Sequence, residues 1–404
     1  MRTERIEAAT GQEYTEALVA YAARFRYEAL PPQAVEQAKT IVLDTLAAIL
    51  AGSHPMYSSS RLVGDLAQLA GGRPECTVIG RDFKTSAESA ALANGTMGYA
   101  GDIEGGSAAR MHVAAVLVPT ALVMGERERA SGKAFLTALA LGYEIGCRVS
   151  EACRTAGSYP HSFHPSAVFG FVGAAATAGH LLGLDAGQLA NAFGIAASTA
   201  GGLITWVNDP TENTRPFVIG VAARGGVTAA LLAKLGFGGP RRIFDPGKFD
   251  IYDAYAGEAH PERLLDGLGR DVWILQAHRF KRHPCCGDIH TGLDGLLAIR
   301  AEERLAAGDI ARVVHRVKKD RAPVIDGNPL RSHCAQYIMA VAAVEGALEL
   351  STFLKDRSGE PAIAEMMKRV ELVGDAALDA WPSSAPAVVE VTTRDGRRFV
   401  RRVE

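Results

Sequence analysis

The chain is poor in cysteine and carries almost no net charge. Its six cysteines include no CxxC pair and form no dense framework, so a reducing, cytoplasmic compartment fits best. A net charge of -2, with acidic and basic residues interspersed, argues against a nucleic acid or a membrane surface as partner. The polar N-terminal segment has no apolar signal-peptide core, and no uninterrupted apolar run reaches the length needed to cross a bilayer. We therefore expect a soluble, cytoplasmic, enzyme-sized protein.

Several common motifs of enzyme sites are also missing. The sequence has no GxGxxG after a strand, no Walker loop, no GxSxG and no HExxH, which removes the commonest dinucleotide, nucleotide, esterase and zinc-protease interpretations. It has no internal repeat and no low-complexity tract. With 404 residues the chain is long enough for two domains, each with its own core.

What is abundant in the first two-thirds of the chain is Ala, Leu and Gly at helical spacing. This pattern predicts an all-helical domain whose small residues permit helices to approach closely. The predicted helices are Tyr14–Phe25, Pro32–Ala51, Ser86–Tyr99, Val116–Arg129, Gly132–Arg154, Ser166–Leu182, Ala186–Gly201 and Thr214–Leu235.

The composition changes after about Gly257. Asp395-Gly396 between two alternating segments is a strong hairpin signal. We therefore expect a mainly α fold, with a large all-helical domain over residues 1–260 and a smaller α+β lid domain over 261–404. The elements predicted for the second domain are strands at Val272–Leu275 and Arg312–Lys318, helices at Ile289–Arg300, Leu330–Leu348 and 361–370, and the hairpin Ala387–Val403.

The segment from Ala91 to Glu126 is the most informative. Asp102 and Glu104 lie in a glycine-rich turn, and His112 follows directly before an apolar helical run. One interpretation is a solvated pair of carboxylates and a helix-capping histidine. The other is a general acid/base pair, because imidazole transfers protons near neutral pH and a carboxylate fixes its tautomer or raises its basicity.

Two further segments place polar groups at predicted helix starts. His164 precedes a helix that Ser166 could cap, and a helix start favours a bound anion and disfavours imidazolium. The alternatives are a plain connecting loop, or a zinc site with His161 that lacks further ligands nearby. Arg215 begins a long helix, where a cation opposes the macrodipole unless both face an anion. The alternative there is a surface arginine beside a helix cap.

Two motifs lie in the second predicted domain. A basic triplet before Pro-Cys-Cys could bind a carboxylate, and the two cysteines are interpreted as buried small groups rather than as a nucleophile or metal ligands. Tyr337, at the head of an apolar helix, is either a core residue or a phenol that donates a proton. The triplet consists of Lys281, Arg282 and His283.

These segments, in this order and over almost the whole chain, resemble the MmgE/PrpD family, which includes 2-methylcitrate dehydratase, cis-aconitate decarboxylase and iminodisuccinate epimerase. The ordered set is specific to that family. It comprises Leu30-Pro31 with Ile41–Gly52, Cys76–Gly80, Ala91–Gly95, His164–Gly170 with Gly183–Asp185, Gly220–Ala223 with Gly236–Pro240, Phe280-Lys281, Pro284-Cys285, and Ser332-His333 with Tyr337.

The resemblance implies a large helical domain with a smaller α+β lid, a homodimer, and an active site without metal or organic cofactor. The positions that match the family's site residues are Asp102, His112, His164, Lys281 and Tyr337.

The sequence departs from the family pattern at three places. D-I-E-G-G replaces the usual D-F-D-D-T, so the hydroxyl at Gly106 is absent, and T-R-P replaces T-K-R, so Arg215 replaces a lysine. An arginine fork suits bidentate carboxylate binding but does not donate a proton. The sequence also ends at Glu404 after its hairpin, where family members commonly continue with helices that return to the first domain.

From these residues we predict a cofactor-independent lyase that acts on a small di- or tricarboxylate. Arg215, Lys281 and His283 are expected to bind the substrate, because a carbanion beside a carboxylate needs fixed cations. Dehydration like that of 2-methylcitrate dehydratase comes first, and decarboxylation like that of cis-aconitate decarboxylase uses the same cationic residues.

His112 or His164 is expected to move the proton, oriented by Asp102, while Tyr337 or the other histidine protonates the leaving hydroxyl or the new carbanion. Two alternatives stay open. One is an epimerase with two bases on opposite faces of an acidic carbon, and the other is a non-catalytic homologue that binds carboxylates.

Overall fold

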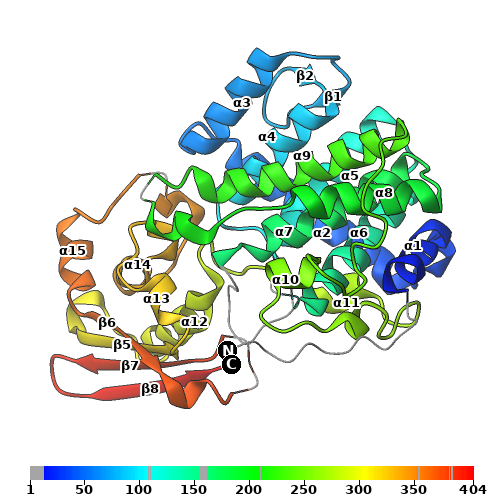
Figure 1. Cartoon of the computed structure of the whole chain (residues 1–404). Coiled ribbons are helices and arrows are strands. Elements are labelled where there is room, and N and C mark those ends of the chain that lie inside the picture. Colours follow the sequence, from blue (N-terminus) through cyan, green and yellow to red (C-terminus); the bar gives the residue numbers. More distant parts are fainter. Residues whose placement is uncertain are drawn as a thin grey trace. The chain divides into compact units, whose positions relative to one another are not determined.

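The computed structural model describes residues 13–107, 109, 111–153, 162–209, 211–353, 355–381, 383 and 385–404 (Figure 1). The chain divides into two compact units, neither of which is contiguous in sequence. The domain boundary near residue 260 stays a prediction. Unit 1 comprises Met1–Ala100, Glu104–Ile204 and Asn213–Phe280, and unit 2 comprises Gly101–Ile103, Thr205–Glu212 and Lys281–Glu404.

Unit 1 is helical, and the eight helices predicted for it are present with ends that differ by a few residues. The helix α3, which starts with three serines, was not predicted. The helices are α1 (Tyr14–Arg24), α2 (Pro32–Gly52), α3 (Ser58–Ala70), α4 (Ala87–Ala100), α5 (Val113–Arg127), α6 (Gly132–Ala152), α7 (Pro165–Leu181), α8 (Ala186–Thr199), α9 (Thr214–Lys234), α10 (Ile251–Tyr255) and α11 (Trp273–Ala277). Two short antiparallel pairs join them, β1 (Cys76–Thr77) with β2 (Lys84–Thr85), and β3 (Gly106–Ser107) with β4 (His278–Arg279).

The centre of unit 1 is formed by α4, α9, α7 and α6, in which α4 packs against α9, α9 against α7 and α7 against α6. Glycines allow the close approach that the sequence predicts. A Cβ on Gly95 of α4 would lie 2.9 Å from the Cα of Gly220 of α9, and one on Gly173 of α7 would lie 2.9 Å from the carbonyl oxygen of Gly142 of α6. Because backbones touch at these points, the ends of the helices are held in fixed positions.

The helix α9 bears on the expectation that no segment of the chain is long and apolar enough to cross a membrane. By length and composition alone it is apolar enough to cross a membrane, although no uninterrupted apolar run in the sequence reaches the length needed. It packs against α4, α7 and α8, and the side chain of Arg215 is fully buried in its first turn. The core helix of a globular unit meets the same length and composition criteria, so this feature is weak evidence for a membrane span.

Unit 2 is the α+β part of a mainly α chain, as predicted. Its sheet has the order β6-β5-β7-β8, with β5 parallel to β6 and antiparallel to β7, and it packs against α12 and α14. The hairpin turn at Asp395-Gly396 is confirmed. The elements are α12 (Gly287–Glu302), β5 (Ile310–Lys318), α13 (Ala322–Ile325), α14 (Ala335–Glu345), α15 (Pro361–Met367), β6 (Val370–Asp375), β7 (Ala387–Thr393) and β8 (Arg398–Val403).

Three predictions of local structure were wrong. The strand predicted at Val272–Leu275 is the short helix α11, whose start is fixed by a tertiary bond from the backbone N–H of Trp273 to the buried carboxylate of Glu144. The strand β6 was not predicted, and its first residue, Val370, was assigned to the end of the predicted helix over 361–370. The helix predicted over Leu330–Leu348 is shorter, and a 3₁₀ turn at Arg331–His333 precedes it.

Candidate active site

The first cluster of candidate residues, in unit 1, gathers at the N-termini of three helices. His112 is the N-cap residue of α5, His164 is the N-cap residue of α7, and Arg215 lies in the first turn of α9. The backbone N–H of His112 donates to the hydroxyl of Ser166 at 2.8 Å. Ser166 was expected to cap α7, and instead it fixes the start of α5 against the start of α7. Helix N-termini favour bound anions.

The two imidazoles of this cluster lie near each other and nearly parallel. The ring centroids of His112 and His164 are 6.4 Å apart with an interplanar angle of 22°. Nδ1 of His112 lies 3.0 Å from Oε1 of Glu104, whose side chain is fully buried, while 28% of the His112 side chain is exposed. Within unit 1 the carboxylate beside His112 is therefore that of Glu104, while the orienting role expected of Asp102 stays a prediction.

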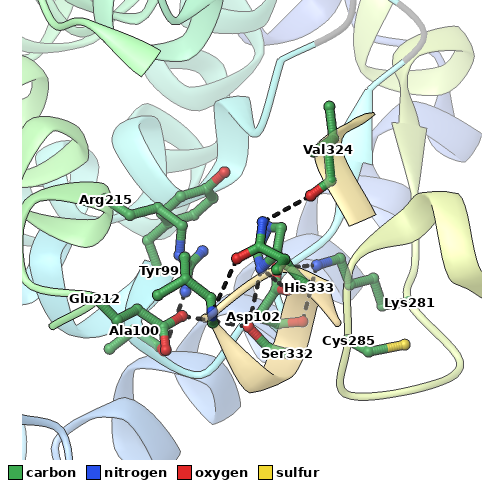
Figure 2. A network of polar contacts seen from close by, with 12 residues as sticks. Tyr99, Ala100, Asp102, Glu212, Arg215, Lys281, Cys285, Val324, Ser332 and His333 are labelled. Carbon is green, nitrogen blue, oxygen red and sulfur yellow. Dashed lines mark hydrogen bonds and ion pairs between the residues drawn. The ribbon is translucent and has the colours of Figure 1, made fainter. Parts of the chain in front are cut away.

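Arg215 is fully buried, and groups at the end of α4 contribute to the compensation of its charge. Its guanidinium carbon lies 4.7 Å from the ring centroid of Tyr99, a cation–π distance. Its Nη2 donates to the carbonyl oxygen of Ala100 at 3.3 Å, at the negative end of α4 (Figure 2). The hydroxyl of Tyr99 also lies 3.5 Å from Nε2 of His164. Tyr99 is thus a common neighbour of Arg215 and the imidazole pair.

The loop that carries Glu104 is anchored by the β3–β4 pair. Gly106 pairs with Arg279 and Ser107 with His278, and a Cβ on Gly105 would lie 2.3 Å from Nε2 of His278. Nδ1 of His278 lies 3.0 Å from the hydroxyl of Tyr143. Burial, and secondarily the charge of His112, lowers the pKa of His278 to about 4, so this ring is neutral at neutral pH.

The second cluster belongs to unit 2 and is built on Asp102 and Lys281. The ammonium of Lys281 donates to Oδ1 of Asp102 at 2.5 Å and to its carbonyl oxygen at 2.8 Å, and both side chains are buried (Figure 2). Asp102 has a φ of 54°, in the left-handed region that few non-glycine residues adopt. Such strained residues concentrate at functional sites, because the surrounding structure must hold them there.

His333 and Ser332 extend this second cluster. Nδ1 of His333 lies 3.6 Å from Oδ2 of Asp102 and 3.0 Å from the hydroxyl of Ser332. The same hydroxyl donates to Glu212 at 3.3 Å, and the indole of Trp206 packs edge-on against the imidazole. An acid, a lysine and a histidine are therefore held together by a network of polar contacts (Figure 2).

Tyr337 and His283 lie in other surroundings. Tyr337 is fully buried in the core of unit 2, its hydroxyl donates to the carbonyl oxygen of Thr352 at 3.4 Å, and burial raises its pKa. This placement supports its interpretation as a core residue. Nε2 of His283 lies 2.9 Å from Oδ1 of Asp294.

The two adjacent cysteines of the fourth motif are buried. Burial raises the pKa values of Cys285 and Cys286, which keeps both thiols protonated and inert. This environment supports their interpretation as small packing groups. Within the described parts of the chain, no group of three or more His, Cys, Asp or Glu side chains is arranged to hold a metal ion. His161, the other half of the zinc alternative, lies outside the described residues.

The structure thus brings the predicted site residues together in two sets, His112 with His164 and Arg215, and Asp102 with Lys281. Sequence reasoning did not select the residues that complete these sets. For His333 the signal was available, because a histidine stands directly before an apolar helix. The other residues could not be selected from the sequence, because only their tertiary contacts place them in the site. The residues missed are Tyr99, Glu212, His278 and His333.

The arrangement in unit 1 is suited to proton transfer beside an anion. A buried guanidinium and helix N-termini supply fixed positive charge, which stabilises negative charge that develops on a substrate. Two imidazoles belong to the same cluster, one of them against a carboxylate, which is the composition of a general acid/base pair.

Comparison with known protein families agrees with this composition. Residues 16–264 match the MmgE/PrpD N-terminal domain, and residues 283–404 match the MmgE/PrpD C-terminal domain.

Individual relatives are similar over most of their length. The chain is 28% identical to cis-aconitate decarboxylase of Mus musculus over 390 residues, which cover 91% of this chain and 77% of that protein. It is 28% identical to the cis-aconitate decarboxylase-like protein oryM of Aspergillus oryzae over 398 residues, 91% of this chain and 81% of that one. It is 25% identical to 2-methylcitrate dehydratase of Cupriavidus necator over 410 residues, 92% of this chain and 81% of that one.

Proposed function

Because the chain belongs to the MmgE/PrpD family, we propose that it is a lyase that acts on a small di- or tricarboxylate. Relatives with the names cis-aconitate decarboxylase and 2-methylcitrate dehydratase support lyase chemistry at 25–28% identity. The proposal covers both reactions, because both create negative charge on a carbon near a carboxylate.

The observation that carries the proposal is that the buried Arg215 and the imidazoles of His112 and His164 all contact the ring of Tyr99. Removal of a proton next to a carboxylate gives a carbanion that adds to an existing negative charge, so a fixed cation is needed. Arginine binds a carboxylate through two parallel N–H···O bonds, which also fixes the orientation of the substrate.

Within this proposal, His112 is the base. Glu104 holds its Nδ1 side, so that the proton of the substrate is taken on Nε2. In a dehydration, the C–H electron pair forms the double bond while His164 donates a proton to the departing hydroxyl, which leaves as water. In a decarboxylation, the C–C bond to the carboxylate breaks, carbon dioxide leaves, and an imidazolium returns a proton to the carbon.

We propose that Lys281 serves the same reaction by binding a further carboxylate. Its buried ammonium already forms an ion pair with one carboxylate, that of Asp102. In the sequence only Ile103 separates Asp102 from Glu104, so one short loop contributes the acidic residue of each cluster.

The experiment is a panel of citrate, 2-methylcitrate, cis-aconitate and amino-diacid substrates, followed by proton NMR in deuterium oxide. The proposal expects elimination of water or loss of carbon dioxide from at least one of them. Binding of these acids without any turnover would contradict it and would select the non-catalytic alternative.

An epimerase is the second candidate, and the near-parallel pair of imidazoles favours it, since two bases are what epimerisation requires. In the same experiment an epimerase introduces solvent deuterium into recovered substrate without net elimination. Assembly as a homodimer and a cytoplasmic location remain predictions from the resemblance and the composition.

A further inference from the structure

Tyr99, the penultimate residue of α4, is the centre of the unit 1 cluster. Its ring centroid lies 4.9 Å from that of His112 and 6.1 Å from that of His164, both in edge-on geometry. Its face carries the guanidinium of Arg215 at 4.7 Å, and only 3% of its surface is exposed. The ring of Tyr99 therefore contacts all three of these groups.

The hydroxyl of Tyr99 lies near the imidazole of His164. Its hydroxyl oxygen lies 3.5 Å from Nε2 of His164, which is itself buried. A phenol beneath a cation is a stronger hydrogen-bond donor than an isolated one, because the cation stabilises the negative charge that donation leaves on the ring. A hydrogen bond donated to Nε2 makes that nitrogen the acceptor and leaves the proton of the neutral ring on Nδ1.

We propose that Tyr99 is a positioning residue for the reaction, which fixes the tautomer and the orientation of His164. The expected effect of Tyr99 on turnover rests on the proposed function. The expected effect of Tyr99 on the tautomer of His164 rests on the contacts alone. Arg215 then has a second role besides binding a carboxylate. It holds the ring of Tyr99 in place and strengthens the hydrogen bond from the hydroxyl.

The test is Tyr99→Phe, which removes the hydroxyl but keeps the ring under Arg215. The matched control is Tyr252→Phe in the same unit, because Tyr252 is equally buried but its hydroxyl donates to the carbonyl oxygen of Phe244 at 2.9 Å, far from any imidazole contact. Both changes remove one buried hydrogen bond, so a similar fall in melting temperature is expected for both.

The first readout is the nitrogen NMR spectrum of the histidine side chains, with the His164 signals identified by their loss in His164→Ala. The wild type is expected to show the Nδ1-protonated ring for His164, and Tyr99→Phe a mixture of tautomers. The same tautomer and the same shifts in both proteins would overturn the proposal. This readout needs no substrate, so it decides the role of Tyr99 even if no carboxylate is turned over and the proposed function fails.

The second readout is kinetic, with the substrate identified in the panel. Tyr99→Phe is expected to lower kcat about 10-fold with a smaller change in KM, the size of one hydrogen bond of about 1.4 kcal/mol. The alkaline limb of the pH profile of kcat/KM, which reports the proton donor His164, should move to higher pH in Tyr99→Phe, because a donor to Nε2 favours the neutral imidazole and the variant lacks that donor. Tyr252→Phe should change neither. An equal fall in kcat for both variants, with no movement of the pH profile, would show a merely structural role and contradict the proposal.

Discussion

At the scale of single residues, the most unusual group is the fully buried cation Arg215. A charge in such a place is tolerated only if nearby groups compensate it. The ring of Tyr99 and the last carbonyl of α4 are two groups that do so. We infer that its geometry, and not only its charge, matters to the site.

Arg215→Lys is therefore expected to raise KM for the carboxylate substrate about 10-fold while kcat changes less, because an ammonium binds as a point charge and loses the bidentate geometry. Steady-state kinetics measures this. Arg224→Lys is the control, since Arg224 lies exposed on the same helix. Equal KM values for the wild type and Arg215→Lys would show that charge alone suffices.

The pair of Asp102 and Lys281 allows a double-mutant test. Lys281→Met leaves the buried carboxylate of Asp102 without its ammonium and is expected to lower the free energy of unfolding by about 3–5 kcal/mol. Adding Asp102→Asn should restore part of that loss, while activity stays absent in both variants. Lys39→Met, which breaks the exposed pair with Glu36, should change stability little. Simple additivity of Lys281→Met and Asp102→Asn would argue against direct coupling.

The sequence could predict at this scale which residue types matter but not how they pair. Asp102, His112 and Lys281 stand out because chemistry-bearing groups follow glycine or precede helices. That Glu104 contacts His112, and that His333 contacts Asp102, depends on side-chain directions inside a folded loop. No spacing rule contains this information, because loops have no fixed period.

At the scale of elements, two of the shortest strands, β3 and β4, position the loop that carries Glu104. The pair β3–β4 holds the loop that carries Glu104 against His278, and Gly105 fits there because it has no side chain. A Cβ at this position would also lie 2.8 Å from the backbone oxygen of Arg279, so the backbone would have to move.

Gly105→Ala is accordingly expected to displace the loop and to lower kcat/KM about 10-fold or more, with a smaller effect on melting temperature because the core helices are untouched. Gly132→Ala, where a Cβ meets nothing within 4 Å, is the control. Unchanged kinetics in Gly105→Ala would show that the loop accommodates a side chain and that the strand pair does not position the acid.

The helices themselves were predictable, because their apolar residues recur with the helical period and Pro or Gly separates them. The short elements were not. The helix α11 depends on a bond to Glu144, and β6 depends on pairing in parallel with β5. Such elements are stabilised by tertiary partners, which outweigh the preference of five or six residues.

At the scale of the whole molecule, buried histidines make stability depend on pH. Burial lowers the pKa values of His278, His290 and His315 to about 4 from 6.5. Between these values each of the three histidines binds more protons in the unfolded chain than in the folded one. The contribution of these histidines to stability is therefore fully present above about pH 6.5 and falls as the pH drops toward 4.

His315→Leu is expected to make this loss shallower by up to about 1.4 kcal/mol per pH unit, because His315 is fully buried in β5 and would no longer be protonated on unfolding. Calorimetric melting temperatures between pH 7 and pH 4 measure the slope. His54→Leu, at an exposed position, should leave the slope unchanged. A parallel pH dependence for the wild type and His315→Leu would exclude His315 as a contributor.

The central claim is that the imidazoles at the helix starts of unit 1 transfer the proton. The most direct measurement is turnover, together with solvent deuterium exchange, of the accepted carboxylate by His164→Ala. His180→Ala, at the other end of the same helix, is its control. The account predicts a fall of about 100-fold or more in turnover for His164→Ala, a smaller fall in deuterium exchange because His112 is the base, unchanged circular dichroism and a normal His180→Ala enzyme. Wild-type rates in a folded His164→Ala protein would contradict it.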